Sequence, residues 1–143
     1  DDVILVLRTF PIRVAGNSGP LVGETTWEAL GIPEEKTTVT LKTRRVAEFS
    51  VATARRAIML NRPTAIALTF VDYVFPELRD KSGQMSETKP VIWRWINNLE
   101  QKLGVPITML GTGPDSVLTR TDGHPPVGRD WPTHQVAYWG NDA

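Results

Sequence analysis

The sequence has 143 residues, of which 41% are hydrophobic, so it is long and apolar enough for one domain with its own core. The 16 basic residues balance 16 acidic ones, and a formal net charge of zero argues against a protein that coats nucleic acid. Without cysteine there is no disulfide framework and no thiolate metal site, and no apolar run approaches the roughly 20 residues that cross a bilayer. We therefore expect a cytoplasmic protein that binds neither nucleic acid nor a membrane.

Residues 3–9 predict a buried strand, because VILVL is a short apolar run. The following stretch is centred on AGNSGP, which holds two glycines and a proline. Glycine lets a backbone approach a ligand closely, so this stretch either wraps a substrate or forms an ordinary surface turn. Thr25 or Thr26 then caps a short helix that runs to Leu30 and ends at Gly31.

Residues 37–72 predict a basic loop, a helix and a strand, and the rest of the chain is organised around them. Glu48 is the only acid between Lys36 and Arg56. The cations of the loop and of the first helical turns are Lys36, Lys42, Arg44, Arg45, Arg55 and Arg56. Ser50 can cap the helix, whose apolar side chains recur at helical spacing and which ends at Asn61 and Pro63.

Residues 64–71 are apolar and partly β-branched, as in a strand that is buried on both faces. Asp72 follows at the carboxyl end of this strand, where open α/β sheets bind their ligands. A cationic loop and a carboxylate, delivered to the same sheet by one helix–strand unit, together predict a binding site.

Residues 73–89 are polar and predict a long connection with room for a hairpin. Pro90 then opens a helix that ends at Gly104. Its apolar stripe consists of Ile92, Ile96, Leu99 and Leu103. Trp93 and Trp95 flank this stripe, and we interpret them as packing residues and not as a platform for bases.

Residues 105–110 predict a third buried strand, followed directly by the loop GTGPDS. Alternating helices and strands indicate an α/β fold with a mostly parallel sheet and covering helices. Asp72 and residues 111–115 would then share one edge of that sheet. We assign residues 1–120 to this domain and residues 121–143 to an irregular tail that lies over the surface or at a partner contact.

Several catalytic motifs are absent from the sequence. There is no GxxxxGK[ST] loop and no GxGxxG after a strand, so no complete phosphate cradle is present. His124 and His134 lie in the tail without carboxylates at metal-ligand spacing, and Ser18, Ser50 and Ser116 lack a GxSxG context. The residues alone predict an anion-binding α/β domain, and we name no catalytic residue and no metal ligand in it.

Four ordered segments resemble the carboxyl-terminal part of adenylosuccinate synthetase. TTVTLKTRRV is similar to the family's arginine-rich TTTGRRRR loop, and ATARRAIMLN to a helix close to VAVRRAVQLN. TFVD and GVPITMLGTGPD then stand where the family has TKLD and GVPI with STGPD, and RTFPIRVAGNSGPL stands in the place of its TRVGEGP segment. The resemblance covers residues 3–120 and implies part of a P-loop NTPase-like fold. The family's GDEGKGK phosphate loop has no counterpart in this chain.

The family joins L-aspartate to IMP with GTP and Mg²⁺, through a 6-phosphoryl intermediate that the amine of aspartate displaces. The resemblance implies a loop that holds aspartate and IMP, made of Thr38, Val39, Thr40, Leu41, Lys42, Thr43 and Arg44. It also implies a nucleotide-base pocket made of Arg44, Phe70, Val71, Asp72, Gly111, Thr112 and Gly113. Mg²⁺ would be bound mainly by the amino-terminal part of the family's fold, and the family is homodimeric. These 143 residues alone are expected to be inactive.

Five positions depart from the family pattern and keep alternatives open, and at two of them, Lys42 and Thr43, an arginine of the loop is replaced. Leu41 replaces a glycine, Phe70 a lysine beside the base, and Gly111 a serine that bonds to guanine. The phosphate donor is therefore GTP, ATP or dATP, and the acceptor is IMP or dGMP. The related viral 2-aminoadenylosuccinate synthetases use dGMP with an adenine nucleotide. A domain that binds nucleotide without catalysis is the third alternative.

Overall fold

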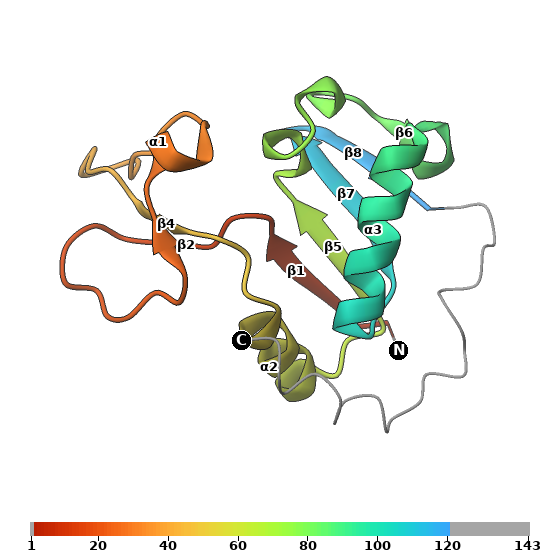
Figure 1. The fold of residues 1–143 in the computed structure, drawn as a ribbon, viewed down its shortest axis with the longest axis horizontal. Helices are drawn as coiled ribbons and strands as arrows, with labels where there is room; N and C mark the ends of the chain where they lie inside the picture. The colour runs from red at the N-terminus through yellow and green to blue at the C-terminus, as the bar shows by residue number, and fades with distance from the viewer. Residues whose placement is uncertain (1, 121–143) are drawn as a thin grey trace.

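The computed structural model describes residues 2–120, which form a large sheet and a separate small sheet (Figure 1). The large sheet has the order β1-β5-β7-β8-β6. Its strands are β1 (Ile4–Arg8), β5 (Ala65–Thr69), β7 (Ile107–Gly113), β8 (Ser116–Thr119) and β6 (Gly83–Gln84). β1, β5 and β7 run parallel, β8 is antiparallel to β7, and β6 is parallel to β8. The mostly parallel α/β sheet predicted from the sequence is confirmed.

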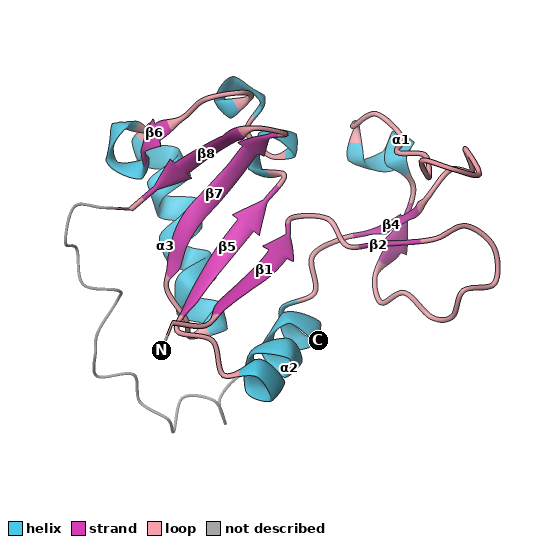
Figure 2. Ribbon diagram, turned by 180° about the vertical axis from the view of Figure 1, so that it is seen from behind, coloured by secondary structure: helices cyan, strands magenta, loops and turns pink. Residues whose placement is uncertain are grey.

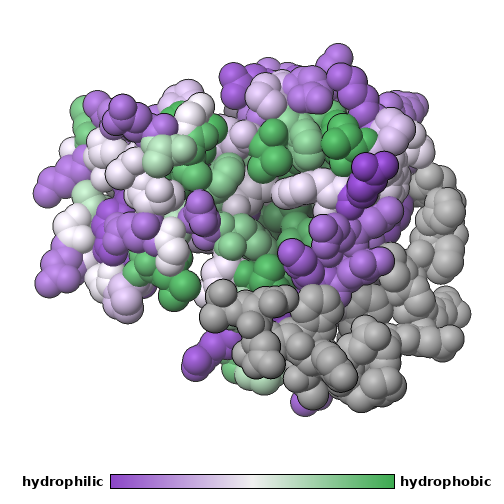
Figure 3. All heavy atoms as spheres, in the orientation of Figure 1, coloured by the Kyte–Doolittle hydropathy of each residue, from purple (hydrophilic) through white to green (hydrophobic). Residues whose placement is uncertain are grey.

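Two helices, α2 (Val51–Asn61) and α3 (Pro90–Leu103), accompany this sheet, and their ends follow the capping signals of the sequence. The Ser50 side chain accepts a hydrogen bond from the backbone N–H of Thr53, and Gly104 ends α3 in the left-handed conformation. Ile92 and Ile96 of α3 are fully buried in the core of the sheet. The outer side of α3 is hydrophilic (Figure 3), as its amphipathic pattern requires.

The two faces of the large sheet differ in what covers them. α3 lies across one face, and the view from behind shows no helix of residues 2–120 over the other (Figure 2). Burial alternates accordingly: Ile66 and Leu68 of β5 are fully buried, whereas Val6 of β1 is 63% exposed and Val117 of β8 is 40% exposed. The prediction that the strand after α2 is buried on both faces is therefore wrong. The side without a helix of residues 2–120 carries the exposed side chains of Ile4, Val6 and Val117.

A small antiparallel sheet of β2 (Ile12–Arg13), β4 (Arg45–Ala47) and β3 (Glu24–Thr25) lies beside the large one (Figure 1). The sequence did not predict it, because strands of two or three residues show no hydrophobic period. The helix α1 (Trp27–Leu30) follows β3 and begins at Thr26 and ends at Gly31, as predicted.

Two connections differ from their predictions. Residues 73–89 form no hairpin, since they hold the 3₁₀ turns η2 (Pro76–Leu78) and η3 (Met85–Glu87), and β6 pairs with the distant β8. Residues 111–113 are not a loop, because β7 continues to Gly113 and then turns back as β8. The predicted tail, with His124 and His134, lies outside the described residues. No helix within residues 2–120 is long and apolar enough to cross a bilayer.

Candidate functional site

Asp72 lies where the sequence predicts it, just beyond the carboxyl end of β5. The strand ends at Thr69, and Asp72 is the middle residue of the 3₁₀ turn η1 (Val71–Tyr73). The residue is 7% exposed, and its carboxylate Oδ2 lies 3.4 Å from Nε of Arg79. A carboxylate held at the end of a central strand with one long ion pair keeps acceptor capacity for a ligand.

Phe70 changes the direction of the chain between β5 and Asp72. Its φ of 60° lies in the left-handed region, which is unfavourable for a bulky side chain and costs about 1–3 kcal/mol. Its carbonyl oxygen accepts hydrogen bonds from the Thr9 hydroxyl (2.8 Å) and the Tyr73 N–H (3.1 Å). The guanidinium of Arg8 lies 3.8 Å from the centre of its ring. These contacts fix both the backbone and the ring of Phe70 next to Asp72.

The end of β7 lies against the same corner. A Cβ built on Gly111 would lie 3.2 Å from Cα of Thr69, so Gly111 lets β5 and β7 approach closely. A Cβ on Gly113 would clash with the Asp80 carboxylate. Thr112 is fully buried, and its hydroxyl donates to the carbonyl of Lys81. The structure therefore brings together the predicted base-pocket residues 70–72 and 111–113.

The predicted aspartate loop forms a turn closed by its own hydrogen bonds. The N–H of Thr37 donates to the carbonyl of Lys42 (2.9 Å), and the N–H of Lys42 donates to the Thr37 hydroxyl (3.1 Å). Leu41 takes a φ of 53°, the left-handed conformation that a glycine adopts without strain. Val39 at the tip is 92% exposed. The predicted residues 38–43 thus present backbone and hydroxyl groups on an exposed turn.

This turn does not lie on the large sheet beside Asp72. It precedes β4 of the small sheet and lies on the side of that sheet away from β5 (Figure 1). The prediction that one sheet carries both the cationic loop and the carboxylate is wrong in this respect. The physical reason is that Arg45 and the two residues after it pair with β2 and β3, which separates the turn from α2.

Glu35 connects the two parts of the candidate site. Its carbonyl oxygen accepts from the N–H of Arg44 (2.8 Å), and its carboxylate accepts from Arg8 (2.8 Å) and from the Tyr73 hydroxyl (2.8 Å). Burial and the hydrogen bond to Glu35 raise the pKa of Tyr73 to about 12, so the phenol stays protonated and donates. Sequence reasoning did not find this role, because Glu35 looks like a solvent-exposed acid beside Glu34.

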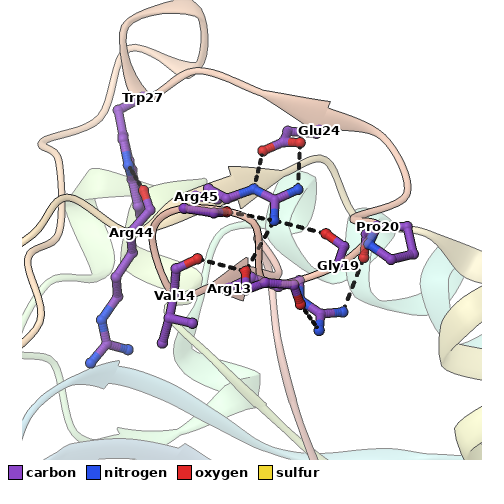
Figure 4. Close-up of polar contacts among 10 residues, drawn as sticks. Arg13, Val14, Gly19, Pro20, Glu24, Trp27, Arg44 and Arg45 are labelled. Carbon is purple, nitrogen blue, oxygen red and sulfur yellow. Dashed lines mark hydrogen bonds and ion pairs between the residues drawn. The ribbon is translucent and has the colours of Figure 1, made fainter.

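Two arginines tie the AGNSGP segment to the small sheet (Figure 4). Arg45 makes a bidentate pair with Glu24, with N–O distances of 2.6 and 2.7 Å, and also donates to the carbonyl of Gly19. This pair raises the pKa of Arg45 and lowers the pKa of Glu24. Arg13 donates to the carbonyl oxygens of Ser18 and Pro20. The sequence left open whether this segment wraps a substrate or forms a surface turn, and these hydrogen bonds favour the surface turn.

Arg44 has a different environment from Arg45. Its carbonyl oxygen accepts from the indole N–H of Trp27 (2.7 Å), which fixes the backbone at this position. Its side chain extends away from the Arg45 cluster (Figure 4), and its Nε is buried with no hydrogen-bond partner among residues 2–120. Arg44 therefore carries a buried N–H donor that the described chain leaves unsatisfied.

Backbone strain gathers at the candidate site. Four described residues other than glycine have positive φ, and one of them, Arg62, is the C-cap of α2. The other three are Leu41 in the turn, Phe70 before Asp72, and Asp80 against Gly113. Strained backbone that the surrounding structure enforces is concentrated at functional sites, which supports the predicted positions.

The described residues do not form a metal site. Within residues 2–120 no group of three His, Asp or Glu side chains could hold a metal ion. Mg²⁺ therefore has no ready-made site in this part of the chain.

Comparisons with known proteins agree with the resemblance. No protein-family model matches the chain. The adenylosuccinate synthetase of Methanocaldococcus jannaschii is 40% identical over 124 residues, which cover 80% of this chain and 33% of that protein. The enzyme of the same name from Methanosphaera stadtmanae is 35% identical over 116 residues, with the same coverage. The chain is related to the adenylosuccinate synthetases. It spans about a third of the length of these relatives.

A second group of relatives comes from phages. The N6-succino-2-amino-2'-deoxyadenylate synthase of Acinetobacter phage SH-Ab 15497 is 40% identical over 90 residues, or 54% of this chain and 23% of that enzyme. Among solved structures, the succinoaminodeoxyadenylate synthetase of cyanophage S-2L, bound to dGMP and dATP, has a TM-score of 0.59 at 30% identity. It matches over 80% of this chain and 32% of its own. The adenylosuccinate synthetase of Plasmodium falciparum, at 16% identity and a TM-score of 0.63 over 80% of this chain and 39% of its own, supports the fold alone.

Proposed function

We propose that the chain supplies the aspartate loop and the nucleotide-base pocket of a ligase that joins L-aspartate to a purine mononucleotide. The energy donor is a purine nucleoside triphosphate. The carboxylate of Asp72 accepts hydrogen bonds from the base of the triphosphate. Residues 38–44 bind the carboxylates of aspartate. Phosphoryl transfer requires a phosphate-binding loop, and this sequence has no complete one, so the proposal concerns binding and positioning.

The observation that carries the proposal is the corner at the ends of β5 and β7. It combines a nearly buried carboxylate at a strand end, two glycines at points of close approach, and strained residues at Phe70 and Asp80. Ligands of open α/β sheets bind outside the carboxyl ends of the strands, and a carboxylate there suits the N–H donors of a purine edge.

The aspartate loop supports the second half of the proposal. L-Aspartate carries two carboxylates, so its site needs fixed cations and backbone N–H groups. The turn over residues 37–42 exposes backbone and hydroxyl groups, and Lys42 and Arg44 add charge next to it. Lysine carries a point charge and lacks the planar guanidinium that binds a carboxylate with two hydrogen bonds. Lys42 would therefore bind a carboxylate less specifically than Arg44. The resemblance also implies that Mg²⁺ binds together with the nucleotide phosphates and that the whole enzyme is a homodimer, and we include both in the proposal.

A second candidate is the reaction of the phage relatives, in which the acceptor is dGMP and the donor ATP or dATP. The phage synthases match at 40% identity, as high as the archaeal enzymes, although over a shorter part of the chain. Phe70 and Gly111, which replace a lysine and a serine of the family pattern, favour this candidate because neither side chain can donate to guanine.

The proposal is tested by calorimetric titration of the chain with Mg²⁺ complexes of GTP, ATP and dATP. We expect saturable binding of at least one of them, lost in Asp72→Ala, because the base would lose its acceptor. Glu28→Ala is the matched control, since it removes an exposed carboxylate from α1. A chain that binds none of the three, or an Asp72→Ala variant that binds as tightly as Glu28→Ala, would refute the proposal.

A further inference from the structure

A cavity of about 230 Å³ lies between α2 and α3, and the function proposed above gives it no role. Hydrophobic side chains are exposed beside α3 on this face of the molecule (Figure 3). None of the residues that line the cavity belongs to the proposed site, which comprises residues 38–44, 70–72 and 111–113. The cavity is therefore separate from the corner at the ends of β5 and β7.

The walls of the cavity are mostly apolar. Leu68 of β5 is fully buried. The other apolar lining residues are half-buried and belong to α3 or to the start of α2, and they are Phe49, Val51, Trp95 and Leu99. The ring of Phe75 meets that of Trp95 edge-on, with 5.4 Å between the ring centres, which fixes the indole. An apolar cavity of about 150 Å³ can hold benzene, so a cavity of 230 Å³ has room for one aromatic ring and a short chain.

The polar residues of the cavity carry donors without partners. Asn98 and Lys102 lie one helical turn apart on α3, and both are exposed. Neither side chain makes a hydrogen bond or an ion pair with any other of residues 2–120. The hydroxyl of Thr9 is already used, because it donates to the carbonyl of Phe70 (2.8 Å). No acidic side chain of the described chain lines the cavity, so its polar side attracts an anion.

We propose that this cavity binds a small monocarboxylate with an aromatic or branched apolar body. The ammonium of Lys102 pairs with the carboxylate, and the amide N–H of Asn98 donates to its second oxygen. The apolar body packs on Leu68 and against the indole of Trp95. Mostly apolar walls with a few converging polar groups are the usual form of a small-molecule site. The inference does not depend on the proposed function, because a different set of residues carries it.

The test is a calorimetric titration of the chain with hydrocinnamate and, separately, with hydrocinnamyl alcohol. The two compounds have the same apolar body, and the alcohol lacks the charge. We expect the acid to bind with a Kd of about 1 mM, in the range that so few atoms can supply, and the alcohol about tenfold more weakly. In Lys102→Met the affinity for the acid should fall about tenfold and that for the alcohol should stay, because methionine keeps the apolar stem without the charge.

Lys81→Met is the matched control, because it removes another exposed lysine that does not line the cavity. It should leave both affinities unchanged. Val51→Phe adds a ring to the wall of the cavity and should abolish binding of both compounds, with the fold checked by circular dichroism.

A wild type that does not bind hydrocinnamate, or binds it no more tightly than the alcohol, overturns the inference. A Lys102→Met variant that keeps the wild-type preference for the acid overturns it too, as does a folded Val51→Phe variant that binds like the wild type. If Val51→Phe does not fold, the comparison of Lys102→Met with Lys81→Met still decides. None of these outcomes bears on nucleotide binding, which Asp72→Ala tests separately.

Discussion

The large sheet and the small sheet of this chain are stabilised in different ways. The large sheet has a continuous apolar core, in which side chains of β5, β7 and α3 are fully buried against one another. The small sheet has two strands of only two residues, and its buried residues Trp27, Val46 and Ala47 lie outside that core. Its shape depends on hydrogen bonds from Arg13 and Arg45 to nearby carbonyl oxygens and to Glu24.

The two kinds of interaction have different consequences: burial in the large sheet determines stability, and hydrogen bonds in the small sheet determine the geometry of its loops. Hydrophobic burial is strong and non-directional, so the large sheet can hold Asp72 in place at a strand end. Hydrogen bonds are directional, so the small sheet can define the shape of an exposed turn while contributing little to the free energy of unfolding. Substitutions in the two sheets should therefore change different observables.

The largest effect is expected from Leu68→Ala in the core of the large sheet. Leu68 is fully buried, and the cavity should lower the free energy of unfolding by about 3 kcal/mol. Val46→Ala removes an equally buried side chain from the small sheet. We expect it to leave global unfolding in urea nearly unchanged and to speed hydrogen exchange at Ile12 and Thr25, which pair with Val46. Equal global losses in both variants would show that the two sheets unfold as one unit, and the contrast would fail.

The same contrast explains which parts of the fold could be predicted from the sequence. α2 and α3 have caps and apolar stripes longer than two turns, so local signals were sufficient for them. β2, β3 and β6 have two residues each, and their partners are distant in the sequence. Glycines at 111 and 113 suggested a loop, whereas in the structure they allow β7 to pass close to Thr69 and Asp80.

The candidate site was likewise predictable in part. Asp72 was placed by a strand-end rule that depends only on the preceding apolar run. The position of the turn over residues 37–42 depends on β4 pairing in a second sheet, which no local pattern indicates. Glu35 was missed because its role comes from tertiary contacts with Arg8 and Tyr73, which are distant in the sequence.

A smaller effect is expected from Glu100 in the large sheet, which should make the stability of the protein depend on pH. Glu100 is fully buried, and burial raises its pKa, although hydrogen bonds from Ile107 and Arg120 oppose this. An acid with a raised folded-state pKa binds its proton more tightly when folded. Its contribution to stability is therefore complete below the unfolded pKa of about 4.5 and is lost as the pH rises through the folded pKa.

We expect urea unfolding to show falling stability above about pH 4.5, by less than the loss in Leu68→Ala, and a flatter profile in Glu100→Gln. Glu28→Gln, at an exposed acid of α1, should keep the wild-type slope. A Glu100→Gln profile parallel to that of the wild type would show that Glu100 does not set this dependence.

The smallest effect on stability, with a clear local signature, is expected from Arg45→Lys in the small sheet. Lysine cannot reproduce the fork that holds Glu24 and the carbonyl of Gly19. The segment 14–23 should become more accessible, and thermolysin should cut it faster, while the urea midpoint stays nearly unchanged. Arg56→Lys on the exposed side of α2 is the control, and equal cleavage rates in the two variants would contradict the role assigned to Arg45.

Glu35 has a thermodynamic consequence for a chain built from two such unlike sheets. Its backbone holds Arg44 beside the turn, and its carboxylate holds Arg8 and Tyr73 beside Asp72. If a ligand at either place shifts this one residue, the two binding events become coupled. Linkage then requires reciprocity: the factor by which a nucleotide tightens the binding of aspartate equals the factor by which aspartate tightens the binding of the nucleotide. One residue, through its backbone and its side chain, would thus couple two separate binding sites.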